Sequence, residues 1–197
     1  LKARQNSMPK DNIERAIKKG AGELEGVNYE EGVYEGYGPG GIAMMVEVMT
    51  DKKSRTVPEL KSIFKSNGGT MADANAVAYL FDKKGLILVE GDNITEDAVM
   101  EIALDAGAED IEKDDEKVYA VKTSVNDFHA VLTAMEPKVA AKGFKITESS
   151  LKYIPQTTIA VDAAKGKEAL ELIEALEAHD DVQNVYTNLE LTEAMVA

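Results

Sequence analysis

Strand-like and helix-like apolar segments alternate along the chain. Residues 42–49 are apolar at almost every position, as in a central strand of a sheet. Residues 57–66 then carry apolar side chains at helical spacing, and residues 76–81 return to a strand-like pattern, which predicts a β-α-β unit. Strands and helices that alternate over short connections indicate an α+β fold, with helices on one side of each sheet.

The middle of the chain predicts a ferredoxin-like β-α-β-β-α-β unit. Its strand, helix, hairpin, helix and strand are expected at residues 86–89, 95–106, 110–113 with 118–123, 128–135 and 151–154. Pro137 is expected to break or kink the second of these helices, because proline removes a backbone hydrogen bond. A last β-α-β segment is predicted at residues 157–161, 169–176 and 182–187.

The domain organisation is inferred from the order of these predicted strands and helices. Residues 84–155 hold all the elements of one unit. The flanking pieces, 33–82 and 156–190, each hold half of a second unit, so we infer that the first unit is inserted in the second. Three sequential pieces are the alternative that the sequence also allows. Residues 20–32 are rich in Gly and Glu and predict a linker after a helix at residues 9–19.

Composition narrows the class of protein. The 197 residues include no cysteine, which excludes disulfides and thiolate metal sites. No apolar run approaches the roughly 20 residues that span a bilayer, and nothing at the N-terminus resembles a signal peptide. We therefore predict a cytoplasmic protein that does not contact membranes.

No constellation of residues predicts bond-making chemistry. His129 and His179 fall on different predicted helices without evident partners. The acidic residues 114–116 sit where a solvated hairpin tip is expected, rather than a metal site. The glycines of residues 38–41 precede a strand, so they predict a type II turn with Pro39 and Gly40 at its centre; contact with a ligand or RNA is the less favoured alternative. We predict no catalytic residue, no metal site and no cofactor.

Charge is polarised along the chain, whose formal net charge is −14. Residues 1–20 and 52–65 each carry a net charge of +4, whereas residues 91–117 carry −9 and residues 155–197 carry −7. Thr56 and Glu59 have the spacing of a capping box, which would place the preceding cations in a loop at a helix N-terminus, where phosphate can bind. The candidate nucleic-acid-binding residues are Lys10, Arg15, Lys18, Lys19, Tyr37, Lys52, Lys53, Arg55, Lys61 and Lys65.

Several motifs carry a resemblance to a known family. They are residues 8–20 (MPKDNIERAIKKG), 34–41 (YEGYGPGG), 55–57 (RTV), 67–69 (NGG), 77–81 (VAYLF), 106–110 (AGAED) and 181–186 (DVQNVY). In order and spacing the chain closely resembles the YebC/PmpR proteins. The resemblance implies a three-domain architecture: residues 1–26 as the end of an N-terminal helical domain, residues 27–83 with 156–197 as a discontinuous α+β domain, and residues 84–155 as an inserted α+β domain. Both α+β domains are expected to be ferredoxin-like sandwiches. Because the chain starts at Leu1, it is expected to be a fragment that lacks a further basic, helix-rich stretch of the family.

The resemblance also implies a function. It predicts a non-enzymatic regulator of gene expression that binds nucleic acid, either RNA or DNA, or the ribosome. The acidic segments favour a translation factor over a protein that encircles duplex DNA, because like charges repel. A DNA-binding transcriptional regulator is the first alternative, and a small-molecule-sensing α+β module is the second, on fold analogy alone. A monomer is expected.

Overall fold

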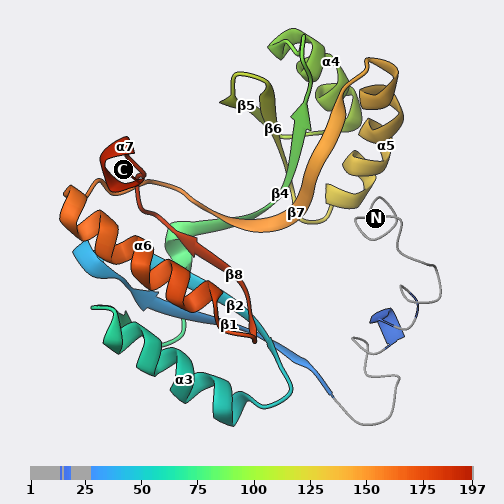
Figure 1. Cartoon of the computed structure of the whole chain (residues 1–197). Coiled ribbons are helices and arrows are strands. Elements are labelled where there is room, and N and C mark those ends of the chain that lie inside the picture. Colours follow the sequence, from blue (N-terminus) through green and yellow to red (C-terminus); the bar gives the residue numbers. More distant parts are fainter. Residues whose placement is uncertain (1–13, 15, 19–27, 197) are drawn as a thin grey trace. The chain divides into compact units, whose positions relative to one another are not determined.

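The computed structural model describes residues 14, 16–18 and 28–196 (Figure 1). Two compact units divide the chain. The second unit is one continuous segment, residues 80–156, and the first unit combines the residues before it with residues 157 onward. Each unit contains one four-stranded antiparallel sheet. The predicted α+β fold class is therefore confirmed.

The sheet of the first unit is built from two distant parts of the sequence. Strands β1 (Glu30–Tyr37) and β2 (Ala43–Thr50) form a hairpin, and the short β3 (Thr70–Met71) pairs with β1. Strand β8 (Val182–Thr187), which follows the second unit in sequence, pairs with β2. The strand order is β3-β1-β2-β8. The two parts of the chain on either side of the second unit thus complete one sheet.

Two helices of the first unit share a hydrophobic core with the sheet. Helix α3 (Lys53–Ser66) and helix α6 (Ala163–Glu177) run side by side in Figure 1, and the short α7 (Glu193–Val196) packs on α6. The fully buried core residues come from β2, α3 and α6 and include Met44, Val46, Leu60, Phe64, Leu172 and Leu176. Alternate residues of β2 face these helices, as expected for a strand.

The second unit has the predicted β-α-β-β-α-β order. Its strands are β4 (Phe81–Glu90), β5 (Asp110–Asp115), β6 (Val118–Thr123) and β7 (Lys145–Pro155), and their order in the sheet is β5-β6-β4-β7. This is the ferredoxin-like arrangement. Its helices are α4 (Glu96–Ala106) and α5 (Phe128–Ala141).

Local sequence signals account for both ends of α4, but they do not account for the continuation of α5 through Pro137. The side chain of Thr95 accepts a hydrogen bond from the Ala98 amide, and Gly107 ends α4 with a φ of 92°, which agrees with the helix predicted at residues 95–106. Helix α5 continues through Pro137, so the predicted break is wrong. Pro137 is exposed, and water can satisfy the carbonyl that loses its amide partner. Buried Met135 and Val139 hold the helix on both sides of it.

Three other element predictions are wrong. Residues 30–32 were expected to belong to the linker and no strand was predicted before residue 42, yet residues 30–37 form β1. Residues 76–81 are not a strand; a 3₁₀ turn, η2 (Ala78–Leu80), leads into β4. Residues 157–161 form only an isolated bridge, between Ile159 and Leu189. β1 was missed because its glycines hide the strand pattern. Gly36 is needed there, since a Cβ atom would lie 2.6 Å from the Phe64 ring.

The Gly38–Gly41 segment is a turn between β1 and β2. Gly40 has φ 77° and ψ 6°, the conformation expected at the third position of a type II turn. The Gly41 amide donates to the Gly38 carbonyl at 3.0 Å, which closes the turn. A Cβ atom on Gly40 would lie 2.7 Å from Cγ1 of Val161, so the turn packs closely against the segment that enters α6. The geometry agrees with the structural interpretation of these glycines.

Candidate functional site

The predicted basic residues of the N-terminal segment are only partly covered by the structure. Lys10, Arg15 and Lys19 lie outside the described residues. Lys18 is exposed. The remaining candidates belong to the first unit and lie on or next to α3, apart from Tyr37 at the end of β1.

Helix α3 begins earlier than its sequence suggested. Lys53 is its first residue and Lys52 its N-cap, so the predicted N-cap at Thr56 is wrong, and Lys53 and Arg55 lie in the first turn rather than in a loop. Thr56 is fully buried, and its hydroxyl is engaged in tertiary contacts instead of capping. The Lys52 amide donates to Oγ1 of Thr50 at 3.0 Å, which anchors the start of the helix.

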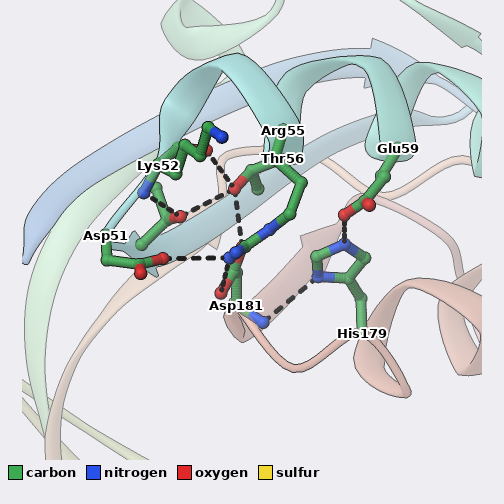
Figure 2. A network of polar contacts seen from close by, with 8 residues as sticks. Asp51, Lys52, Arg55, Thr56, Glu59, His179 and Asp181 are labelled. Atoms are coloured by element: carbon green, nitrogen blue, oxygen red, sulfur yellow. Dashed lines mark hydrogen bonds and ion pairs between the residues drawn. The ribbon is translucent and has the colours of Figure 1, made fainter.

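A polar network joins the start of α3 to the loop between α6 and β8 (Figure 2). Oγ1 of Thr56 donates to Oδ2 of Asp181 at 2.6 Å. Nη2 of Arg55 donates to the same carboxylate, at 3.0 Å to Oδ2, and to Oδ1 of Asp51 at 3.0 Å. Oγ1 of Thr50 lies 2.7 Å from Oγ1 of Thr56, and Thr50 is a further hydrogen-bond partner of the Asp181 carboxylate.

Asp181 is the centre of this network and is only 9% exposed. Burial by itself would raise the pKa of Asp181, but the hydrogen bonds from Thr56 and Arg55 outweigh it and hold this pKa below its ordinary value. The same contact with Asp181 raises the pKa of Arg55. Asp181 is therefore a charged, nearly buried anchor for the first turn of α3.

His179 extends the network along α3. Its Nε2 lies 2.9 Å from Oε2 of Glu59, and its Nδ1 accepts a hydrogen bond from the Asp181 amide at 3.1 Å. The second contact makes Nδ1 an acceptor, so Nε2 carries the proton that is donated to Glu59. The expectation that His179 has no partner is wrong, and Glu59 serves this contact rather than a capping box. His129 is exposed on α5.

The network borders an open cleft of about 540 Å³. Arg55, Glu59, His179, Asp180 and Asp181 line it, with Ala178. The lining holds three carboxylates and one guanidinium group, and this guanidinium pairs with Asp181 and with Asp51. Lys53 is likewise paired, through Glu30 at 2.7 Å. The start of α3 therefore does not present an unopposed cluster of positive charge, although its sequence has a net charge of +4.

The cations farther along α3 are arranged differently. Lys61 and Lys65 are exposed and lie one helical turn apart on the side away from buried Leu60 and Phe64. Within the described part of the chain, neither forms an ion pair, and neither does Lys52. We refer to Lys61 and Lys65 as the α3 lysine pair. Tyr37 is 40% exposed, and its hydroxyl donates to the Ala76 carbonyl at 3.3 Å.

Glu35 was not identified from the sequence, and it organises the opposite side of the sheet. It is buried, and its carboxylate accepts backbone hydrogen bonds from Asn75, Val77 and Ala78 at 2.6, 2.7 and 2.8 Å. Burial would raise the pKa of Glu35, whereas these amide donors lower it, and the net effect is a lowered pKa. Glu35 thus fixes the segment before η2.

Neither Glu35 nor Asp181 had a sequence signal of its own, because acidic residues beside predicted strands usually face solvent. Among residues 28–196, no three His, Asp or Glu side chains are placed to hold a metal ion. In the same range, none of the helices combines the length and apolar character needed to cross a membrane.

Comparison with known proteins places the chain in a family. The family profile described as "TACO1/YebC second and third domain" matches residues 29–189. A probable transcriptional regulatory protein of Leptospira biflexa is 52% identical over 195 residues, which are 98% of this chain and 77% of the relative. A protein of the same description from Treponema denticola is 50% identical over 193 residues, covering 98% of this chain and 76% of its own length.

A solved structure agrees with these sequence matches. The crystal structure of a conserved hypothetical protein from Aquifex aeolicus superposes with a TM-score of 0.83 and 38% sequence identity, over 97% of this chain and 77% of that one. The profile match spans the two units described above and the relatives match over nearly the whole chain. This chain therefore belongs to the TACO1/YebC family.

Proposed function

We propose that this protein regulates gene expression by binding RNA on the ribosome, as a cytoplasmic monomer that catalyses no reaction. Family membership and the relatives named as probable transcriptional regulatory proteins support a role in gene expression. The observation that carries the binding surface is the α3 lysine pair, because Lys61 and Lys65 are exposed on one face of a helix and lack carboxylate partners in the described part of the chain.

The charge distribution supports RNA or ribosome binding over binding around duplex DNA. The chain has a net charge of −14, and a broad footprint on duplex DNA would bring many carboxylates close to phosphates. A short basic helix face needs only a few phosphates, which a folded RNA can offer. The exposed ring of Tyr37 is available for stacking on a base.

The ion pairs at the start of α3 decide which basic residues are suited to a binding test. Lys53 and Arg55 are paired with carboxylates, so replacing them would break these ion pairs as well as remove positive charge. Lys61→Gln/Lys65→Gln removes two positive charges without breaking a described ion pair. Lys113→Gln/Lys145→Gln is the matched control, because these two lysines of the second unit are also exposed and also lack ion pairs in the described part of the chain.

The test is a salt titration of binding to ribosomes, to a structured RNA and to duplex DNA. Each phosphate contact contributes about −0.7 to −0.9 to the slope of log affinity against log salt, so the Lys61/Lys65 variant should flatten the slope for RNA or ribosomes by about 1.4 to 1.8. The control variant should leave the slope unchanged. Equal slopes for parent and Lys61/Lys65 variant with all three ligands would refute the proposed surface.

The DNA-binding alternative is kept because the relatives' names favour it. A flattened slope confined to duplex DNA would support that alternative and contradict RNA or ribosome binding.

A further inference from the structure

The sheet of the second unit has one face covered by helices and one face that these helices leave open. Ile87, Val89, Tyr119 and Val121 share the covered face and pack with buried residues of both α4 and α5. Side chains alternate between the two faces along a strand. The opposite face, called the open face below, therefore carries Leu86 and Leu88 of β4, Ala120 and Lys122 of β6, Asp110 and Glu112 of β5, and Glu148, Lys152 and Ile154 of β7.

The open face carries an apolar strip. Leu86 and Leu88 are half-buried, lie beside Ala120 of β6, and do not belong to the core cluster formed with α4 and α5. Ile154 is half-buried too, but it lies beyond the paired positions Lys84 and Lys152. Beside them lies a shallow cavity of about 270 Å³, whose lining includes Asp82, Lys84 and Ile154. An apolar surface with a polar rim is the usual composition of a protein-binding site.

The rim of the open face is acidic. Its lysines are matched by carboxylates: Lys84 pairs with Glu109 at 2.7 Å and Lys152 with Glu148 at 2.7 Å. Lys122 pairs with Glu112 and lies 3.9 Å from Asp110. Acidic residues on and beside this face, namely Asp82, Glu90, Glu109, Asp110, Glu112 and Glu148, outnumber its four lysines, which are the three above and Lys145 opposite Glu90. The whole second unit, residues 80–156, has sixteen acidic and nine basic side chains, a net charge of −7.

We propose that the open face docks a lysine- and arginine-rich protein segment. Cations of the segment would meet the carboxylate rim, and its apolar side chains would cover Leu86 and Leu88. Complementary charge sets the choice of partner, because the acidic rim repels phosphates and attracts ammonium and guanidinium groups. The partner class goes beyond the proposed function, and the open face lies in a different unit from the α3 lysine pair. Failure of either proposal would leave the other standing.

The experiment uses the whole chain and a fluorescein-labelled peptide of alternating lysine and leucine, with binding measured by anisotropy. Asp110→Asn/Glu112→Gln removes two carboxylates from the open face. Glu101→Gln/Asp105→Asn removes two from α4, where each is also paired with a lysine, Lys142 at 2.6 Å and Lys138 at 3.2 Å. The open-face variant should bind the peptide about fivefold more weakly, whereas the α4 variant should bind like the parent.

A variant that is expected to bind the peptide more tightly, instead of more weakly, separates the proposal from an effect of misfolding. Lys84→Gln leaves Glu109 without its cation and should tighten peptide binding, and loss of fold cannot produce that result. A peptide with glycine in place of leucine should bind the parent more weakly, because the apolar strip of the face is then not covered.

Equal weakening by the open-face and α4 variants would overturn the proposal, since it would mean general charge attraction. Binding of an RNA oligonucleotide that the Asp110/Glu112 variant impairs would also overturn it, as would a self-associated parent protein that the same variant converts to monomer.

Discussion

Replacing Asp181 by alanine should destabilise the first unit strongly. Asp181 is 9% exposed, and its carboxylate accepts a hydrogen bond from the hydroxyl of the fully buried Thr56 at 2.6 Å. A hydrogen bond to a charged group contributes about 1.5–3 kcal/mol, and its loss leaves a buried hydroxyl with one partner fewer. We therefore expect Asp181→Ala to lower the free energy of unfolding by about 2–3 kcal/mol. The contact with Arg55 is left out of this figure because that side chain is 44% exposed and screened by solvent.

The assay combines urea unfolding with hydrogen exchange of backbone amides. Hydrogen exchange assigns the loss to a unit, because peptides of β2, α3 and β8 report on the first unit and peptides of β4 and β6 on the second. Thr56→Val should give a similar loss. The double variant should lose less than the sum of the two, because both replacements remove the same hydrogen bond.

A surface carboxylate is the control for this prediction. Asp105 pairs with Lys138 but is 69% exposed, so Asp105→Ala should change the free energy of unfolding by less than about 0.5 kcal/mol. The reasoning is refuted if Asp181→Ala costs no more than Asp105→Ala, or if the two losses at Asp181 and Thr56 simply add.

Three further outcomes are expected. The pKa values of Glu35 and Asp181 are lowered, so the stability that these carboxylates contribute is fully present above their ordinary pKa values, 4.5 and 3.8, and is lost as the pH falls through the lowered values. In urea titrations at a series of pH values, Glu35→Gln should therefore lose less stability than the parent as the pH is lowered. Gly40→Ala should destabilise more than Gly41→Ala, because both have φ 77° but only Gly40 would bring its Cβ atom against Val161, and equal melting temperatures would contradict this. Deleting the second unit and joining residue 79 to residue 157 with a short Gly/Ser linker should leave a first unit that unfolds cooperatively, because β8 still supplies the edge of its sheet. A gradual melting curve by circular dichroism would count against the inserted arrangement.

A stretch of sequence with a net positive charge does not by itself form a positively charged surface. Lys52, Lys53 and Arg55 look alike along the chain, yet Lys53 meets Glu30 and Arg55 meets Asp51 and Asp181. Asp181 is 126 residues from Arg55, so no local pattern could pair them. Lys61 and Lys65 keep the character that the sequence suggested, because their face of α3 is directed away from the core.

The fold class, the order of elements in the second unit and the family could all be predicted from the amino-acid sequence. These follow from local physics: apolar residues at strand or helix spacing, a threonine cap at Thr95, and a glycine at position 107 that can adopt a positive φ. Family motifs such as residues 34–41 and 181–186 are likewise contained in short segments. Each of these signals depends on neighbouring residues alone.

Contacts between segments that are far apart in the sequence could not be predicted from local patterns. β1 is recognised as a strand because β2 pairs with it along its whole length, although two of its residues are glycines that leave room for Phe64 and other neighbours. Thr56 lies inside α3, which begins at Lys53, and its hydroxyl donates to Asp181 in the loop before β8 instead of capping the helix. Local propensities differ by about 1 kcal/mol or less, so a buried, charge-assisted hydrogen bond or a complete strand pairing outweighs them.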